Sequence, residues 1–341
     1  MVPRNPSPRD VFVGELRREY ILSTNQEWII DSPGGSALYA AGGYLVWEKE
    51  YPPGLSTRVG EDFPRTWLED FSERNIETGG VIILPQPLDL RSCIIQEGGS
   101  AWETSRPVPH LTRLGASLPP GLVGLPDRTQ ELDTRRDRTP AAIHETDIPE
   151  VYLAATGVHF CPLDYLSHNL LPAVFRQRGY TTLTLDPGSS YLDPSYYGDV
   201  PALVTGLTAF LPSEAGLRKL YKGVSNDLWE MAADLGHYGC EFVVIRGDTG
   251  GQYLYEQASE RRWEIGPYPA RVRNPFGSGD AFCGGFLIGY RRSFDPLEAV
   301  CCGSVAASLA VEGSGPFYPL GALPGLADAR LEVVRDLVRE V

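Results

Sequence analysis

The sequence is poor in lysine and contains no long hydrophobic run. None of its three lysines, Lys49, Lys219 and Lys222, follows a glycine as in the Gly-Lys-Ser/Thr phosphate loop, which excludes a Walker-type NTPase. No apolar run approaches the roughly 18 residues that cross a bilayer. Acidic residues number 44 against 30 basic ones, and the net charge of −14 would repel a nucleic-acid backbone or an anionic membrane. We therefore expect no nucleic-acid and no membrane partner.

The cysteine and histidine patterns indicate neither a metal site nor a disulfide framework. No Cys-x-x-Cys pair occurs, and none of the five histidines stands at metal-ligand spacing. The segment Met1–Asp10 is polar and proline-rich and lacks the apolar stretch of a signal peptide. We therefore expect a soluble cytoplasmic protein with buried, reduced thiols. The six cysteines are Cys93, Cys161, Cys240, Cys283, Cys301 and Cys302.

The hydrophobic pattern predicts an α/β fold. The length of 341 residues and the hydrophobic content of 42% allow one large domain or two smaller ones. In the second half, expected strands alternate with expected helices, which is typical of parallel β-α units in one twisted sheet. The expected strands are Val11–Val13, Tyr20–Leu22, Trp28–Ile30, Val81–Leu84, Cys93–Ile95, Val151–Ala155, Thr182–Asp186 and Glu241–Arg246. The expected helices begin near Pro33 and Pro64 and span Leu163–Gln177, Asp227–Tyr238, Asp280–Tyr290, Leu297–Ala310 and Leu326–Val341.

Residues 96–149 interrupt this regular pattern. They contain seven prolines and show no sustained hydrophobic period. A structureless connection of this length is uncommon inside a compact domain. We interpret the segment as either a functional covering segment or a partly mobile insertion.

The segment Asn274–Gly285 carries the pattern most directly related to chemistry. It reads Asn-Pro-Phe-Gly-Ser-Gly-Asp-Ala-Phe-Cys-Gly-Gly. Glycines just before a helix allow backbone N–H groups to point at an anion, and the helix N-terminus adds partial positive charge. An aspartate in the first turn, Asp280, would stand beside that anion and accept a proton from a hydroxyl during phosphoryl transfer. The alternative is that Asp280 merely caps a helix whose glycines form a turn.

Several blocks, in order, resemble the ribokinase-like, or PfkB-type, family of carbohydrate and nucleoside kinases. The blocks are Pro33–Ala37, Val59–Phe63, Ile76–Thr78, Asp186–Pro187, Phe210–Glu214, Val244–Gly250 and Gly277–Phe286. The last block matches the family's C-terminal signature, in which the aspartate is the catalytic base and the residues before it form the anion hole. The resemblance extends from Val11 to about Pro316 and implies a kinase domain over residues 10–341.

The resemblance implies an α/β class fold, a three-layer α/β/α sandwich with a small β lid whose strands lie at about residues 19–32 and 80–96. It also implies an ATP- and Mg²⁺-dependent phosphotransferase that acts on a hydroxymethyl group. In that reaction Asp280 would be the general base and Gly277, Ser278 and Gly279 the anion hole. The acceptor would be positioned by Glu19, Gly34, Gly35, Ser36 and Tyr39. The nucleotide would be bound by Arg246, Gly247, Thr249, Gly250 and Asn274, in a groove that helix Leu297–Ala310 also borders.

Two departures from the family pattern concern the acceptor. Glu19 stands where many sugar kinases have the shorter aspartate, so the reach to a diol changes. Tyr39 stands where ribokinases have an asparagine, so ribose specificity does not carry over. Trp28 and Trp102 are aromatic residues that would stack on an acceptor ring, although a lid would contain them in any case.

Two further departures concern cations. The family's Asn-x-x-Glu element, which helps to organise Mg²⁺, is degenerate, with Ser213 and Gly216 at its ends in one register and Leu211 and Glu214 in the other. Glu214 is the only carboxylate there and is our candidate for metal binding. Asn274 replaces an aspartate that is tied to monovalent-cation binding in some members, which argues against potassium activation.

Three functional hypotheses follow. The first is a kinase that phosphorylates a sugar or sugar-like metabolite, and a close variant is a nucleoside kinase in which Tyr39 or a lid aromatic residue stacks on the base. The third, of a different class, is a catalytically weak or non-catalytic protein that binds a nucleotide or metabolite. The partner in each case is a small molecule, and a homodimer through the lid strands is compatible with the family.

Overall fold

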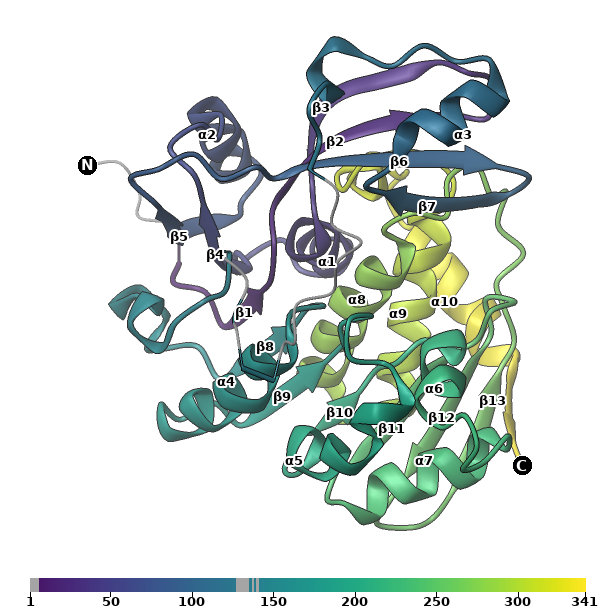
Figure 1. Ribbon diagram of the computed structural model, residues 1–341. Helices are drawn as coiled ribbons and strands as arrows, with labels where there is room; N and C mark the ends of the chain where they lie inside the picture. The colour runs from purple at the N-terminus through teal and green to yellow at the C-terminus, as the bar shows by residue number, and fades with distance from the viewer. Residues whose placement is uncertain (1–5, 127–134, 137, 139–140) are drawn as a thin grey trace.

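The computed structural model describes residues 6–126, 135, 136, 138 and 141–341. Within these residues, the middle layer of the fold is a sheet of ten strands (Figure 1). The strands are β1 Asp10–Val13, β4 Gly54–Val59, β5 Glu77–Ile83, β8 Gly157–Phe160, β9 Thr182–Leu185, β10 Ala209–Phe210, β11 Phe242–Arg246, β12 Gln252–Glu256, β13 Arg262–Ile265 and β14 Val338–Glu340. Their order across the sheet is β14-β13-β12-β11-β10-β9-β8-β1-β4-β5. The strands from β11 to β5 run parallel, whereas β12, β13 and β14 are added as antiparallel strands at one edge.

Helices cover both faces of this sheet, so the predicted three-layer α/β/α architecture is confirmed (Figure 1). One face carries α4 Tyr165–Gln177, α5 Val200–Val204, α6 Glu214–Leu220 and α7 Leu228–His237. The other face carries α1 Ser36–Leu45, α2 Arg65–Glu73, α8 Ser278–Ser293, α9 Pro296–Ala310 and α10 Leu326–Asp336. Short 3₁₀ helices lie at Pro120–Leu122, Glu145–Asp147, Glu150–Tyr152, Pro194–Asp199 and Tyr318–Gly321.

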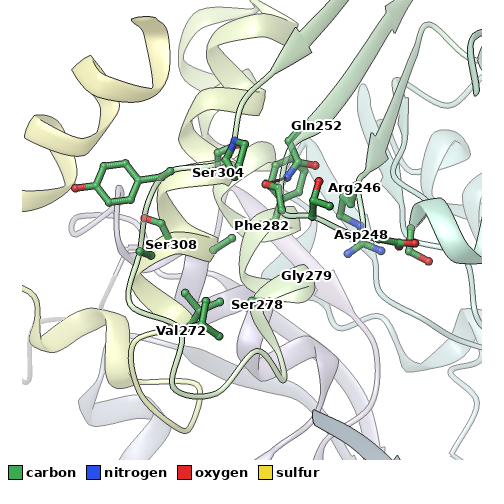
Figure 2. A pocket seen from close by; sticks show the side chains of 18 residues that line it. Arg246, Asp248, Gln252, Val272, Ser278, Gly279, Phe282, Ser304 and Ser308 are labelled. Atoms are coloured by element: carbon green, nitrogen blue, oxygen red, sulfur yellow. Dashed lines mark hydrogen bonds between the residues drawn. The ribbon is translucent and has the colours of Figure 1, made fainter. Parts of the chain in front are cut away.

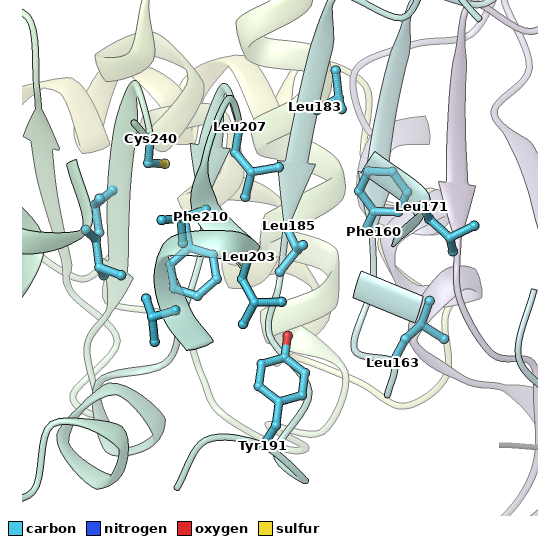
Figure 3. Close-up of a cluster of buried hydrophobic side chains, with 14 of the residues drawn as sticks. Phe160, Leu163, Leu171, Leu183, Leu185, Tyr191, Leu203, Leu207, Phe210 and Cys240 are labelled. Carbon is cyan, nitrogen blue, oxygen red and sulfur yellow. The ribbon is translucent and has the colours of Figure 1, made fainter. Parts of the chain in front are cut away.

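Alternation of side chains along the strands divides the core between the two faces. In β1, Val11 and Val13 join the cluster under α4 and α7, whereas Phe12 joins the cluster under α1 and α2. In β11, Val243 and Val244 separate in the same way. Strands buried on both faces read as continuous apolar runs, which is why the sequence pattern reveals them. Figure 3 shows part of the first cluster, with Phe160, Leu185 and Phe210 from the strands and Leu171 and Leu203 from the helices.

A second sheet of four strands forms the lid above one end of the large sheet (Figure 1). Its strands are β2 Arg17–Leu22, β3 Trp28–Gly34, β6 Arg91–Glu97 and β7 Ser100–Thr104, in the order β3-β2-β6-β7. The expected lid segment at residues 80–96 is correct only in its second half. Strand β5 pairs in parallel with β4, so it is the edge of the large sheet and not part of the lid. Local sequence does not distinguish these two sheets, since both use short apolar strands.

The expectation that residues 96–149 are irregular is wrong for the first part of that segment. Strand β7 completes the lid, and helix α3 Pro107–Leu114 follows it. Leu111 and Leu122 pack against Tyr20 and Cys93 of the lid sheet. Because these contacts lie on one face of the lid, the described part of the segment is a covering element. Residues 127–134, 137, 139 and 140 lie outside the described part of the chain.

Two other predicted elements are corrected. The apolar run Val151–Ala155 forms no strand; it contributes to a 3₁₀ helix, and β8 begins later at Gly157. Within the run, Tyr152 packs into the core and donates its hydroxyl to Leu55 O at 2.7 Å, and Ala155 is buried, whereas Val151 and Leu153 are exposed. The helix expected over Leu326–Val341 ends at Asp336, and its last residues form β14 instead.

Glycine and alanine in α1, α8 and α9 allow these helices to pack backbone against backbone, as their composition predicts. A Cβ atom on Gly284 of α8 would lie 1.8 Å from Ala40 O of α1, and one on Gly43 would lie 2.0 Å from Ala281 O. This close contact fixes where α8 begins, and so where its first turn lies relative to the sheet. Within the described residues, the structure has no helix with the length and apolarity to cross a bilayer.

Candidate active site

The first turn of α8 forms the centre of the site. Gly277 precedes the helix with φ of 77°, a left-handed conformation that a glycine adopts without strain. Ser278 begins the helix and donates its hydroxyl to Pro275 O at 2.7 Å. Asp280 is the third residue of the helix, beside the partial positive charge of the helix N-terminus.

The amides in this turn are not equivalent. The N–H of Ser278 donates to Pro275 O at 3.3 Å, which is a long hydrogen bond. Ser278 would have to exchange this bond to serve as an anion-hole donor, whereas no such bond is made by the N–H groups of Gly277 and Gly279 within the described residues. The sequence treats the three residues alike, so this difference appears only in the structure.

A cavity of about 400 Å³ opens beside this turn (Figure 2). Its walls come from the turn after β11, from the start of α8, and from α9, which are the three segments that the sequence placed around a groove. The predicted residues that line it are Arg246, Gly247, Thr249, Gly250, Ser278 and Gly279. The α9 residues that line it are Ser304, Ala307 and Ser308. A cavity of this size has room for a nucleotide-sized ligand.

Asn274 does not line the cavity. Its side-chain oxygen accepts the N–H of Phe276 at 3.0 Å, and its amide nitrogen donates to Ser314 Oγ at 3.1 Å. The side chain is buried and ties the loop before α8 to the segment after α9. Asn274 therefore shapes the loop that leads into the first turn of α8.

The predicted acceptor residues meet around the carboxylate of Glu19. Its Oε1 accepts the N–H of Gly35 at 2.9 Å, and its Oε2 accepts the hydroxyl of Tyr39 at 2.8 Å. A Cβ on Gly34 would lie 2.0 Å from the carboxyl carbon, so the carboxylate rests directly on this glycine. Ser36 lies at the start of α1, close to the thiol of Cys161.

Tyr39 connects this acceptor side to the turn of α8. A Cβ on Gly277 would lie 2.3 Å from the Tyr39 ring, and the ring contacts Phe276 edge to face at a centroid distance of 6.0 Å. The two groups of residues that the sequence assigned to different blocks are therefore neighbours. Because Tyr39 is only 3% exposed, its ring has no free face on which a nucleobase could stack.

The two tryptophans considered for stacking also lie elsewhere. Trp28 and Trp102 pack against the lid cluster that α3 covers, and Trp102 contacts His110 at 6.0 Å between ring centroids. This is the face of β2 that carries Tyr20, whereas Glu19 points to the opposite face, toward α1. Trp28 and Trp102 are therefore not part of this site.

Two carboxyl groups in the site have pKa values raised to about 7. Burial and the nearby carboxylate of Asp186 together raise the pKa of Asp280 to about 7, while Arg246 opposes the shift. Burial likewise raises the pKa of Glu19 to about 7, although the hydrogen bonds from Tyr39 and Gly35 favour its ionised form. Both carboxyl groups therefore exchange protons near neutral pH, as acid–base groups in enzymes do.

Arg246 lines the cavity and also forms an ion pair with a buried aspartate. It ends β11, and its Nη2 donates to Asp186 Oδ1 at 2.6 Å. Asp186 follows β9, and the sequence assigned it no role in the site although it noted the block Asp186–Pro187. The position of Asp186 directly after a buried parallel strand is the signal that would have identified it, because ligands bind at the carboxyl ends of such strands.

Glu214 begins α6 at the edge of the cavity. Its Oε1 accepts a bond from Arg218 at 2.8 Å, and its Oε2 accepts the N–H of Asp248 at 3.3 Å. The described residues contain no group of three metal-ligating side chains. Mg²⁺ commonly uses one or two carboxylates together with substrate phosphates, so a single carboxylate such as that of Glu214 is compatible with an ion that arrives with a nucleotide.

Comparison with known proteins relates this arrangement to kinases. Residues 174–321 match the model of the pfkB family carbohydrate kinases. The chain is 28% identical over 272 residues to a cytidine kinase of Thermococcus kodakarensis. This alignment covers 79% of this chain and 84% of the cytidine kinase.

Solved structures share the fold. An E. coli protein assigned as a ribokinase II, in complex with ATP and Mg²⁺, aligns with a TM-score of 0.69 and 16% identity, over 96% of this chain and 99% of its own. A Burkholderia thailandensis nucleoside kinase in complex with inosine aligns with a TM-score of 0.67 and 16% identity, over 95% of this chain and 98% of its own. These similarities extend over the large sheet and the lid together.

Proposed function

Because this chain is a ribokinase-like kinase of the PfkB carbohydrate kinase family, we propose that it transfers the γ-phosphoryl group of ATP to a hydroxymethyl group of a sugar or sugar-like acceptor. The observation that carries the proposal is the placement of Asp280 in the first turn of α8, next to Gly279, which lines the cavity, and close enough to Glu19 and Tyr39 to raise their pKa values. A base at that place can reach an acceptor hydroxyl while the helix N-terminus attracts the phosphate.

In this mechanism Asp280 accepts the proton of the acceptor hydroxyl. The hydroxyl oxygen forms a bond to the γ-phosphorus, the bond from that phosphorus to the bridging oxygen breaks, and ADP leaves with the electron pair. Amides of Gly277 and Gly279, joined by Ser278 once its bond to Pro275 is exchanged, stabilise the charge on the transferred group.

The two sides of the turn bind the two substrates. Gly247, Thr249 and Gly250, with Arg246, hold the nucleotide, and Asn274 acts indirectly by fixing the loop before α8. On the other side Glu19, Gly34, Gly35, Ser36 and Tyr39 form the acceptor site. Glu214 would hold Mg²⁺ together with the nucleotide phosphates, and the ion would supply further positive charge there.

The test compares two aspartates in the same local structure. Asp280 and Asp328 are each the third residue of a helix that follows a left-handed glycine, with φ of 77° at Gly277 and 78° at Gly325. Asp280→Asn should retain ATP binding and lower turnover by about 10³-fold or more, the loss of a positioned base and its charge. Asp328→Asn, on the exposed surface of α10, should leave turnover unchanged.

ADP release is measured with a panel of sugars and nucleosides. The proposal is supported if the wild type and Asp328→Asn release ADP in the presence of a sugar and Asp280→Asn does not. Near-normal turnover in Asp280→Asn would contradict the assignment of the base. Saturable ATP binding without ADP formation for every acceptor would identify a non-catalytic binding protein.

A nucleoside acceptor is the second candidate, and the similarity to a cytidine kinase over most of both chains favours it. The acceptor panel separates the two, since a nucleoside kinase should phosphorylate a nucleoside with a higher kcat/KM than any free sugar. The buried Tyr39 ring predicts that any base recognition uses other contacts than stacking on this residue.

A further inference from the structure

The guanidinium of Arg246 lies against the first turn of α8. Its Nη1 would be 2.7 Å from a Cβ on Gly279, so it occupies space that only a glycine leaves open. Both residues line the cavity, and Figure 2 shows Arg246 and Gly279 on the same side of it. Among the described residues that line the cavity, Arg246 carries the single cationic side chain.

We propose that Arg246, held in place by Asp186, contacts the transferred phosphoryl group and stabilises its charge in the transition state. This inference rests on the proposed function, and it assigns to Arg246 a catalytic role beyond the binding of ATP. Asp186 is a positioning residue in this proposal, since it acts through the guanidinium.

The geometry favours a preorganised cation. Nη2 is bonded to Asp186 Oδ1 at 2.6 Å, and Nη1 lies 3.5 Å from Cys283 Sγ, a weak acceptor. The Nε–H has no hydrogen-bond partner within the described chain, although it is buried. A guanidinium has five N–H donors in a rigid fork, so fixing one end on a carboxylate leaves others oriented for a second anion.

Negative charge around the first turn of α8 gives a fixed cation such as Arg246 an electrostatic role. Asp186 and Asp280 are two carboxyl groups beside Arg246, and each would add to the repulsion of an incoming triphosphate. The family resemblance implies an Asn-x-x-Glu element for Mg²⁺, and this element is degenerate here, with Ser213 and Gly216 at its ends in one register and Leu211 and Glu214 in the other. A fixed cation in a partly buried site stabilises developing charge without reorganisation, which is how an arginine accelerates phosphoryl transfer.

Arg246 exchanges no proton in this step. The proton of the acceptor hydroxyl goes to Asp280, the oxygen-to-phosphorus bond forms, and the electron pair of the broken bond stays on ADP. Burial disfavours the charge on Arg246, but Asp186, Cys283 and Asp280 together more than offset this and raise the pKa of Arg246 above its ordinary value, so the guanidinium stays charged throughout the reaction.

The experiment measures kcat, the KM for ATP and the melting temperature of Arg246→Gln, Arg246→Lys and Asp186→Asn. Arg246→Gln should lower kcat about 10²- to 10³-fold while the KM for ATP changes less than fivefold. Arg246→Lys should recover only part of this loss, because a lysine keeps the charge without the fork. Asp186→Asn should lower kcat by a smaller factor, since the guanidinium remains but is no longer held.

Arg291 provides a matched control. It is also an arginine paired with a buried aspartate, Asp10, at 3.0 Å, but it lies at the far end of α8. Arg291→Gln should lower the melting temperature and leave kcat within about twofold at a temperature where the variant is folded. A loss of kcat in Arg291→Gln as large as in Arg246→Gln would show that any buried ion pair is required, which would overturn the specific role.

Chemical rescue separates charge from packing. Added guanidinium should raise the kcat of Arg246→Ala at least fivefold, whereas urea, which is planar and similar in size but neutral, should not. Where Arg246→Gln does not fold, Arg246→Lys and this rescue carry the test.

The outcomes distinguish the two proposals. Absence of phosphoryl transfer by the wild-type protein contradicts the proposed function itself. An active wild type with unchanged kcat in Arg246→Gln or Arg246→Lys, equal rescue by urea and guanidinium, or an effect confined to the KM for ATP overturns the catalytic role of Arg246 alone.

Discussion

The raised pKa of Asp280 predicts a pH dependence that an ordinary aspartate would not produce. Burial and the carboxylate of Asp186 raise this pKa to about 7, while Arg246 opposes the shift. As the proposed base, Asp280 must be ionised to accept a proton, so activity should be lost as the pH falls through its pKa in the enzyme that has not yet bound the acceptor. Glu19, whose pKa is also raised to about 7, lies on the acceptor side and interacts with Asp280.

The magnitude follows from the fraction of ionised Asp280. With a pKa of about 7, roughly 10% of the groups are ionised at pH 6 and roughly 90% at pH 8. The kcat/KM for the acceptor should therefore rise about ninefold between these two values. An aspartate at its ordinary value would be almost fully ionised at both, and the profile would be flat.

The assay follows ADP release at saturating ATP and Mg²⁺ and constant ionic strength, so that titration of the free nucleotide does not enter. Asp186→Asn should move the acidic limb to lower pH, because it removes a carboxylate that raises the pKa and leaves the opposing Arg246. Glu19→Gln removes the other group that titrates in this range. A flat wild-type profile, or an acidic limb that disappears in Glu19→Gln, would refute the assignment of the limb to Asp280.

Three further predictions concern packing and binding. Gly284→Ala should lower the free energy of unfolding, measured with a chemical denaturant, by about 3 kcal/mol or more, because the new Cβ would lie 1.8 Å from a carbonyl oxygen of α1. Gly321→Ala, which has open space around it, is the control and should leave the free energy of unfolding unchanged. Ala307→Trp places a large side chain of α9 in the cavity, so it should raise the KM for ATP more than tenfold and leave the KM for the acceptor unchanged. A change in the KM for the acceptor alone would contradict the assignment of this cavity to the nucleotide. Tyr39→Phe keeps the ring but removes the hydroxyl that donates to Glu19. Loss of a hydrogen bond to a charged group costs about 1.4 kcal/mol, so the KM for the acceptor should rise about tenfold. An unchanged KM for the acceptor would place Glu19 outside the acceptor site.

Local patterns in the sequence were sufficient for much of the fold. The strands around Val11, Thr182 and Phe242 and the helices α4, α7, α8 and α9 were predicted within a few residues, because apolar runs and helical periods depend on neighbours in the chain. The same reasoning failed for the run Val151–Ala155, in which only Tyr152 and Ala155 are buried and no strand forms.

The site divides in the same way. The sequence by itself determined the helix start at Gly277–Asp280, because a glycine turn followed by an acidic first helical turn is encoded in consecutive residues. The tertiary structure alone decided that β5 belongs to the large sheet, that Tyr39 joins Glu19 to Gly277, and that Arg246 meets Asp186 from 60 residues away. Such contacts depend on which elements the packing of glycine-rich helices and parallel strands brings together, and no local periodicity records that choice.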